Sequence, residues 1–221
     1  VRSRGLGDVY KRQIMYRAFD YKMMDKLGEW ATVPVISGLD DLEHPCQALA
    51  DMVTIKEKLG SFRGKKIVYL GDGNNVCNSL LYASAIMGID MVACCPATRM
   101  PNAEIMLGAA NIAAENGSKI VASHDPQEAC VGADVLYTDT WISMGDDTPV
   151  DKAIKLFQMY QINDELLSIA NPGCIVMHCL PAHRGQEITN EVIEGPHSVV
   201  FDQAENRLHA QKAVLYTLLK D

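Results

Sequence analysis

Short, uniformly apolar runs alternate along the chain with longer stretches in which apolar residues recur every three or four positions. The first kind of pattern predicts buried β-strands and the second predicts amphipathic helices. After His44, for example, Ala48, Met52 and Ile55 would lie on one helix face, and Gly60 would end that helix. Strands are expected in 32–37, 65–70, 91–96, 119–124, 134–141, 173–181 and 198–202. Helices are expected in 44–60, 78–88, 103–117, 126–132, 151–170, 187–195 and 204–220.

Strands that are apolar on both faces and alternate with helices are typical of a parallel sheet that helices cover on both sides. The sequence therefore predicts an α/β fold with a doubly wound parallel sheet over residues 51–195. The flanking pieces 14–50 and 202–221 are expected to be the remnant of a second α/β domain, to which the C-terminal helix returns. Residues 1–13 combine basic side chains with little apolar periodicity, and we expect them to be a non-native or disordered leader.

The composition, 48% hydrophobic and 22% charged, is typical of a globular protein. A net charge of -8 argues against nucleic acid as the main partner, because phosphate backbones require a basic surface. No apolar run approaches the roughly 18 residues that a membrane span needs. The seven cysteines are odd in number and form no Cys-x-x-Cys pair, which predicts reduced thiols and a cytoplasmic location.

In a doubly wound sheet, ligands bind beyond the carboxyl ends of the strands. Three polar segments follow expected strands directly, at 71–75, 139–145 and 178–184. The first begins Gly-Asp-Gly and suggests a dinucleotide site, but that fingerprint needs a third glycine where Val76 stands. A tight turn that requires small residues explains both glycines without a nucleotide, and we therefore set this interpretation aside.

The start of the helix at 44–60 is a first candidate for binding chemistry. His44 and Gln47 lie three residues apart there, beside free backbone N–H groups and the positive end of the helix dipole. This position suits a carbonyl oxygen or an anion. Taken alone, His44 is better explained as a simple helix cap.

The segment after the strand at 134–141 is a second candidate. Asp139 is placed to hold an amine, and Ser143 to hold a carboxylate. The alternative is an ordinary turn that places Trp141 in the core.

Cys179 lies where a buried strand becomes a loop, and its role has several interpretations. It could be a thiolate nucleophile with His178 or His183 as the base, or a neutral packed thiol. Zinc is disfavoured, because one Cys-x₃-His pair lacks a matching second pair. Arg207, on the last helix, is explained either as a site residue or as the partner of Glu205 in a surface ion pair.

Taken together and in order, five segments resemble the ornithine carbamoyltransferases: HPCQALADMVTI, GDGNNV, YTDTWISMG, HCLPAHRG and FDQAENRLHAQKAVL. The resemblance runs from Ile14 to Asp221. Its most specific part is the Ser-Met-Gly loop at 143–145, which distinguishes this family from its aspartate-using relatives. The family transfers a carbamoyl group from carbamoyl phosphate to the side-chain amine of ornithine, producing citrulline and phosphate without a metal or organic cofactor.

The resemblance implies a role for each candidate residue. Carbamoyl phosphate would be bound by Arg17, His44 and Gln47. Ornithine would be bound by Asn75, Asp139, Ser143 and Met144. The reacting carbamoyl group would lie against Cys179, Leu180 and Arg207, with His44, Asp139, Cys179 and Arg207 as the catalytic set.

The sequence departs from the family in one respect, because it contains no Ser-Thr-Arg-Thr segment, which in the family forms a phosphate cradle at a helix N-terminus. The resemblance therefore implies an N-terminally truncated chain that is inactive or weakly active alone. It also implies a homotrimer for the full-length members of the family. We also expect the C-terminal helix to expose its apolar face. Two alternatives remain open: a transcarbamylase for putrescine or an acylated ornithine, and a non-catalytic ornithine-binding module. Arginine synthesis and arginine breakdown fit the sequence equally well.

Overall fold

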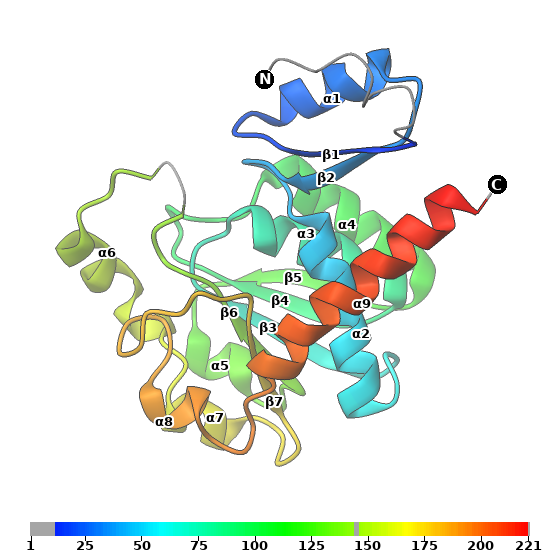
Figure 1. Cartoon of the computed structure of the whole chain (residues 1–221). Helices are drawn as coiled ribbons and strands as arrows, with labels where there is room; N and C mark the ends of the chain where they lie inside the picture. The colour runs from blue at the N-terminus through cyan, green and yellow to red at the C-terminus, as the bar shows by residue number, and fades with distance from the viewer. Residues whose placement is uncertain (1–11, 144–145, 221) are drawn as a thin grey trace.

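The computed structural model describes residues 12–143 and 146–220, and its main feature is a five-stranded parallel sheet (Figure 1). The strand order is β5-β4-β3-β6-β7, and each neighbouring pair runs in the same direction. This arrangement confirms the predicted α/β, doubly wound class. The strands are β3 (Lys66–Leu70), β4 (Asp90–Cys94), β5 (Ile120–Ser123), β6 (Val135–Thr138) and β7 (Ile175–His178).

Helices cover both faces of this sheet and produce two hydrophobic cores. On one face, Tyr69 and Met91 pack against helices α2 (Pro45–Leu59), α3 (Asn75–Met87) and α4 (Ala103–Asn116). On the other face, Leu70 and Leu136 pack against the remaining short helices. Those helices are α5 (Pro126–Cys130), α6 (Val150–Phe157), η1 (Gln158–Tyr160), α7 (Asp164–Ile169) and α8 (Asn190–Ile193). Burial on both faces explains why the strands are apolar throughout.

A smaller α/β unit lies at one end of the molecule (Figure 1). It consists of β1 (Ile14–Arg17), α1 (Tyr21–Trp30) and β2 (Val35–Leu39), and the two strands pair in parallel. The long C-terminal helix α9 (Val200–Leu219) packs along α2, and its end points toward this unit. Its exposed side chains include Leu208 at 60% and Tyr216 at 70%.

Two local predictions needed correction. The helix expected at 78–88 begins earlier, because α3 starts at Asn75 and is capped by Asn74, whose Oδ1 accepts from the N–H groups of Val76 and Cys77. The strand expected at 198–202 is wrong, because Val200 already begins α9. Gly60 ends α2, as predicted, and adopts a left-handed conformation there.

The sheet order places the site-forming loops together. The chain moves from β3 outward to β4 and β5, and then crosses to the opposite side of β3 to form β6 and β7. The loops after β3 and β6 therefore diverge at the switch point, where open α/β sheets have their ligand-binding crevice. Those loops contain Asn74 and Asp139. Among the described residues, no helix is long and apolar enough to cross a membrane.

Candidate active site

A cleft of about 620 Å³ opens at this switch point, between the sheet and the small α/β unit. Eight of the ten predicted site residues line it: Arg17, His44, Asn75, Asp139, Ser143, Cys179, Leu180 and Arg207. Gln47 is buried behind the cleft wall, with 1% of its surface exposed. Met144 lies outside the described residues.

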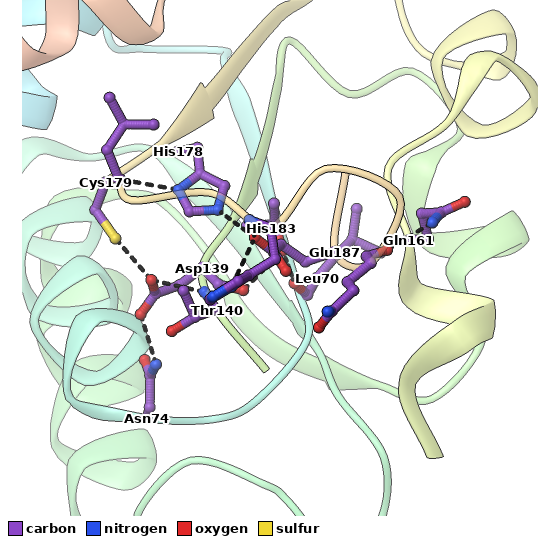
Figure 2. A network of polar contacts seen from close by, with 12 residues as sticks. Leu70, Asn74, Asp139, Thr140, Gln161, His178, Cys179, His183 and Glu187 are labelled. Carbon is purple, nitrogen blue, oxygen red and sulfur yellow. Dashed lines mark hydrogen bonds and ion pairs between the residues drawn. The ribbon is translucent and has the colours of Figure 1, made fainter. Parts of the chain in front are cut away.

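Asp139 is the centre of a polar network on the sheet side of the cleft (Figure 2). Its Oδ1 lies 2.8 Å from Cys179 Sγ and accepts from the Thr140 N–H at 2.7 Å. Its Oδ2 accepts from Asn74 Nδ2 at 2.7 Å. These donors fix the carboxylate in place while it still faces the cleft, so it is positioned to bind a cationic or amine group.

Cys179 is a donor in this network. Burial raises the pKa of its thiol well above the usual value, and the neighbouring Asp139 charge raises it further. The thiol is therefore protonated at neutral pH and donates its hydrogen to the carboxylate. This geometry contradicts the thiolate-nucleophile interpretation, which would require a lowered pKa and an adjacent base.

His178 supports the loop that carries Cys179 and Leu180. Its Nδ1 accepts from the Leu180 N–H at 2.9 Å, and its Nε2 lies 3.1 Å from the buried carboxylate of Glu187 (Figure 2). The ring is therefore the Nε2–H tautomer. Asp139, His178 and Cys179 lie close enough for a metal ion, but both nitrogens of His178 are already in use. The cluster is better described as a hydrogen-bonded support for the loop, in which Leu180 adopts a left-handed φ of 57°.

On the opposite wall, His44 is the N-cap residue of α2, as the simple-cap interpretation expected, but its side chain makes no cap hydrogen bond. Its backbone N–H instead donates to Ser79 Oγ at 2.8 Å. Burial, aided by the positive charges of Arg207 and Arg17, lowers the pKa of His44 to about 4. The imidazole is neutral at pH 7, and among the described residues its buried Nδ1 has no hydrogen-bond partner.

Arg207 is held by a buried network between α2, β6 and α9. Its Nη1 donates to Gln47 Oε1, and Gln47 Nε2 donates to Asp51 Oδ1 at 2.8 Å. Asp51 also accepts from Gln203 and Tyr137, while its complete burial raises its pKa to about 6. Arg207 is therefore no surface ion pair with Glu205. Its buried Nε has no partner among the described residues, which leaves a donor available to a ligand in the cleft.

Asn75 and Ser143, both predicted to bind ornithine, have different hydrogen-bond partners. Asn75 lines the cleft and donates to the Asp40 carbonyl at 2.7 Å, whereas Ser143 Oγ accepts from Asn74 Nδ2 at 3.2 Å. Asn74 thus joins Asp139 to Ser143, a role that was not predicted. The sequence feature that could have identified Asn74 is its residue type, because asparagine is a favoured N-cap before an apolar helix.

Five further residues that line the cleft were not among the predicted site residues. They are charged and belong to the loops after β2, β3, β4 and β6: Asp40, Asp41, Asp72, Arg99 and Asp146. No single motif contains them, and only the sheet order brings them to one cleft.

Comparison with known proteins agrees with this arrangement. Residues 63–218 match the Asp/Orn binding domain of aspartate/ornithine carbamoyltransferase, and residues 4–57 match the carbamoyl-P binding domain of the same proteins. The chain belongs to the aspartate/ornithine carbamoyltransferase family. Asp139 lies in the first matched range and His44 in the second, so the cleft is lined by residues of both matched domains.

Relatives within the aspartate/ornithine carbamoyltransferase family can be ranked by similarity. The ornithine carbamoyltransferase of Methanothermobacter thermautotrophicus is 56% identical over 212 residues, which cover 96% of this chain and 70% of that protein. The solved ornithine carbamoyltransferase from Pyrococcus furiosus is 49% identical with a TM-score of 0.93, covering 96% of this chain and 68% of that one. An acetylornithine transcarbamylase complexed with acetylcitrulline is less similar, at 31% identity and a TM-score of 0.84 over 95% of this chain and 69% of that one.

Proposed function

We propose that this protein transfers the carbamoyl group of carbamoyl phosphate to the side-chain amine of L-ornithine, giving L-citrulline and phosphate. The observation that carries the proposal is the pairing of two opposed walls in one cleft. The Asp139 carboxylate lies on one wall, and neutral His44 with Arg207 lies on the other. An amine nucleophile suits the first wall, and a polarised carbonyl suits the second.

The sheet-side wall would bind ornithine. Asp139 would accept a hydrogen bond from an amine of the substrate, while Asn75, Ser143 and Met144 would hold its amino-acid end. A free alkyl amine is mostly protonated at neutral pH, with a pKa near 10.4. The Asp139–Cys179 pair would orient the neutral amine for attack, because the thiol already occupies one carboxylate oxygen.

The opposite wall would bind carbamoyl phosphate and stabilise the reaction intermediate. Attack on the carbonyl carbon places negative charge on its oxygen, which His44 and Arg207 would stabilise by hydrogen bonds. Removing one such donor typically costs roughly 10²–10³ in rate. The Leu180 carbonyl would accept from the carbamoyl NH₂, and Arg17 would neutralise phosphate charge. Gln47, which is buried behind the wall, would act by holding Arg207 in place.

Collapse of the intermediate completes the reaction. The bond between the carbonyl carbon and the bridging oxygen breaks, phosphate leaves, and phosphate takes up the proton that the amine loses. No oxidation state changes, so we propose that the reaction uses no cofactor. Ornithine is favoured over acylated ornithine because the identity to ornithine carbamoyltransferases, 49–56% in the relatives above, exceeds the 31% to an acetylornithine enzyme.

The wider setting is also a proposal. We place the activity in the cytoplasm, where the seven free thiols would remain reduced. The resemblance favours a homotrimer as the active assembly, and light scattering after gel filtration would measure it.

A panel of amines tests the proposed function. The purified chain is incubated with ¹⁴C-labelled carbamoyl phosphate and L-ornithine, putrescine, N-acetylornithine or L-aspartate, and products are separated over hours because slow turnover is expected. Citrulline should form with a kcat/KM at least about 10² above that of any other carbamoylated product, since polar groups that are left unpaired reject the wrong substrate. Preference for another amine, or no labelled product from a folded chain, contradicts the proposal.

A further inference from the structure

We propose that Arg99 is a positioning residue that fixes Ser143 at the mouth of the cleft and thereby sets affinity for the amino acid. The proposal rests on the function proposed above, because Ser143 matters only if an amino-acid substrate binds there. It assigns to Arg99 a role that neither a motif nor the reaction chemistry required.

Arg99 bridges two loops through both ends of its guanidinium group. Nη1 donates to Asp146 Oδ2 at 2.8 Å, and Nη2 donates to Thr148 Oγ1 at 2.8 Å. The contact is partly shielded, since the side chains of Arg99 and Asp146 are 26% and 19% exposed. Thr148 also donates to Asp146 through its backbone N–H at 2.9 Å, so the three residues form a closed hydrogen-bonded set.

The Arg99 end of this bridge is rigid. The backbone N–H of Arg99 donates to the Pro96 carbonyl at 2.8 Å, and the backbone carbonyl of Arg99 accepts from the Gly73 N–H at 2.9 Å. The contact with Gly73 is tight, because a Cβ added at that glycine would lie 2.2 Å from Pro101 N. The loops after β3 and β4 are therefore packed together, and they present the guanidinium group from a fixed platform.

The Asp146 end leads directly to Ser143. The Asp146 N–H donates to the Ser143 carbonyl at 3.1 Å, while Ser143 Oγ accepts from Asn74 Nδ2 at 3.2 Å. Ser143 is thus held from one side by Asn74 and from the other through Asp146. Loss of the Arg99 contact would release Asp146 from the loop after β4, and among the described residues the neutral hydrogen bond to Asn74 would then anchor Ser143 to the cleft wall.

A second carboxylate lies near the same guanidinium group. Asp72 Oδ1 is 3.9 Å from Arg99 Nη1, farther than Asp146. Burial raises the pKa of Asp72 to about 6, whereas the Thr148 hydroxyl and then Arg99 lower the pKa of Asp146. The contact with Asp146 therefore dominates. Asp72 remains the nearest alternative partner if Asp146 is removed.

Tryptophan fluorescence tests the positioning without requiring activity. Trp141 lies two residues before Ser143 and is 2% exposed, and the chain has one other tryptophan, Trp30, which is 85% exposed. In a Trp30→Phe background, acrylamide should quench Trp141 at least about twofold more efficiently in Arg99→Gln than in the parent. The matched control is Arg184→Gln, because Arg184 makes similar contacts to Asn190 and Glu194 outside the cleft. It should leave the quenching unchanged.

Kinetics then tests the consequence for the substrate. Arg99→Gln and Asp146→Asn should each raise KM for ornithine about tenfold, the effect of losing one charge-assisted hydrogen bond, with kcat within about twofold. KM for carbamoyl phosphate should not change. The double variant should be no worse than either single variant, because both remove the same contact. Arg99→Lys should be intermediate, since an ammonium group cannot replace the planar fork.

The outcomes separate the two proposals. Unchanged quenching in Arg99→Gln overturns the positioning role, as does an additive double variant or an ornithine KM that equals that of Arg184→Gln. A wild-type chain that forms no citrulline refutes the proposed function instead, and quenching alone then decides whether Arg99 holds the loop.

Discussion

Cys179 Sγ lies 2.8 Å from Asp139 Oδ1, so a thiol and a carboxylate that are 40 positions apart form one hydrogen-bonded unit on the cleft wall. The thiol is the donor because burial and the Asp139 charge raise its pKa. The unit therefore provides a fixed carboxylate with one oxygen already satisfied, and it contains no reactive thiolate.

The first prediction concerns the reactivity of this thiol. Cys179 is partly exposed while the other six cysteines are buried, yet we expect iodoacetamide to modify it slowly at pH 7.5, because only the thiolate reacts. Asp139→Asn should accelerate the modification by removing the neighbouring negative charge. Mass spectrometry of the alkylated peptides measures both rates. Fast modification of Cys179 in the unchanged protein would contradict the assignment of the thiol as a donor.

The second prediction concerns the charge of His44. Its imidazole should titrate with a pKa of about 4, against about 6.5 in an unfolded chain, because burial and two arginines disfavour the cation. The unfolded state then binds more protons between these values, so the contribution of His44 to stability is complete above pH 6.5 and declines as pH falls toward 4. NMR titration, with His44→Gln for assignment, measures the value. A pKa at or above 6.5 would be inconsistent with a neutral ring in the cleft.

The third prediction concerns Asp51, which orders Gln47 and through it Arg207. Asp51→Asn replaces an acceptor oxygen with a donor that faces Gln47 and Gln203, and it should cost about 1–3 kcal/mol in the free energy of unfolding. The folded pKa of Asp51, about 6, is above its unfolded value, so the native state binds the proton more tightly. The cost of Asp51→Asn should therefore be larger at pH 4.5 than at pH 7.5.

Urea unfolding at both pH values tests this. The control is Asp202→Asn, which removes an exposed ion pair with Lys58 on the same pair of helices and should cost under about 1 kcal/mol. Equal effects of the two substitutions would show that the buried network does not contribute as described.

The fourth prediction concerns the glycine turn after β3. Gly73→Ala would bring Cβ within 2.2 Å of Pro101 N, a backbone atom that cannot rotate away, and should destabilise the protein by roughly 2–4 kcal/mol. Gly28→Ala is the control, because that helical glycine has open space around its Cβ position and should be neutral or stabilising. Thermal unfolding compares the two variants. Tolerance of Gly73→Ala would contradict the close packing of the two loops.

Much of the fold was predictable because apolar runs and helix periodicity report burial directly. The central strands and the end of α2 at Gly60 follow from such local patterns. The strand expected at 198–202 failed for a physical reason: a short apolar run at the start of a helix has the same composition as a buried strand. Ser198 forms only an isolated bridge to Val176 before α9 begins.

The site was predictable only where a motif marked it. His44 and Asp139 belong to recognisable segments, but the contacts between such segments depend on how the whole chain folds. Arg207 meets Gln47, 160 positions away, and Arg99 meets Asp146, 47 positions away. Neither contact has a local signature, because the folding of the whole sheet creates it.

The proposed function requires Asp139 to orient an amine for carbamoyl transfer in this cleft. Its most direct test is the rate at which the ¹³C label of carbamoyl phosphate appears in the ureido carbon of citrulline, measured by NMR for the unchanged chain and for Asp139→Asn. We expect the substitution to lower the rate by about 10²–10³, while Asp151→Asn on exposed α6 leaves it unchanged. A rate that does not depend on Asp139 would rule out this role of the carboxylate.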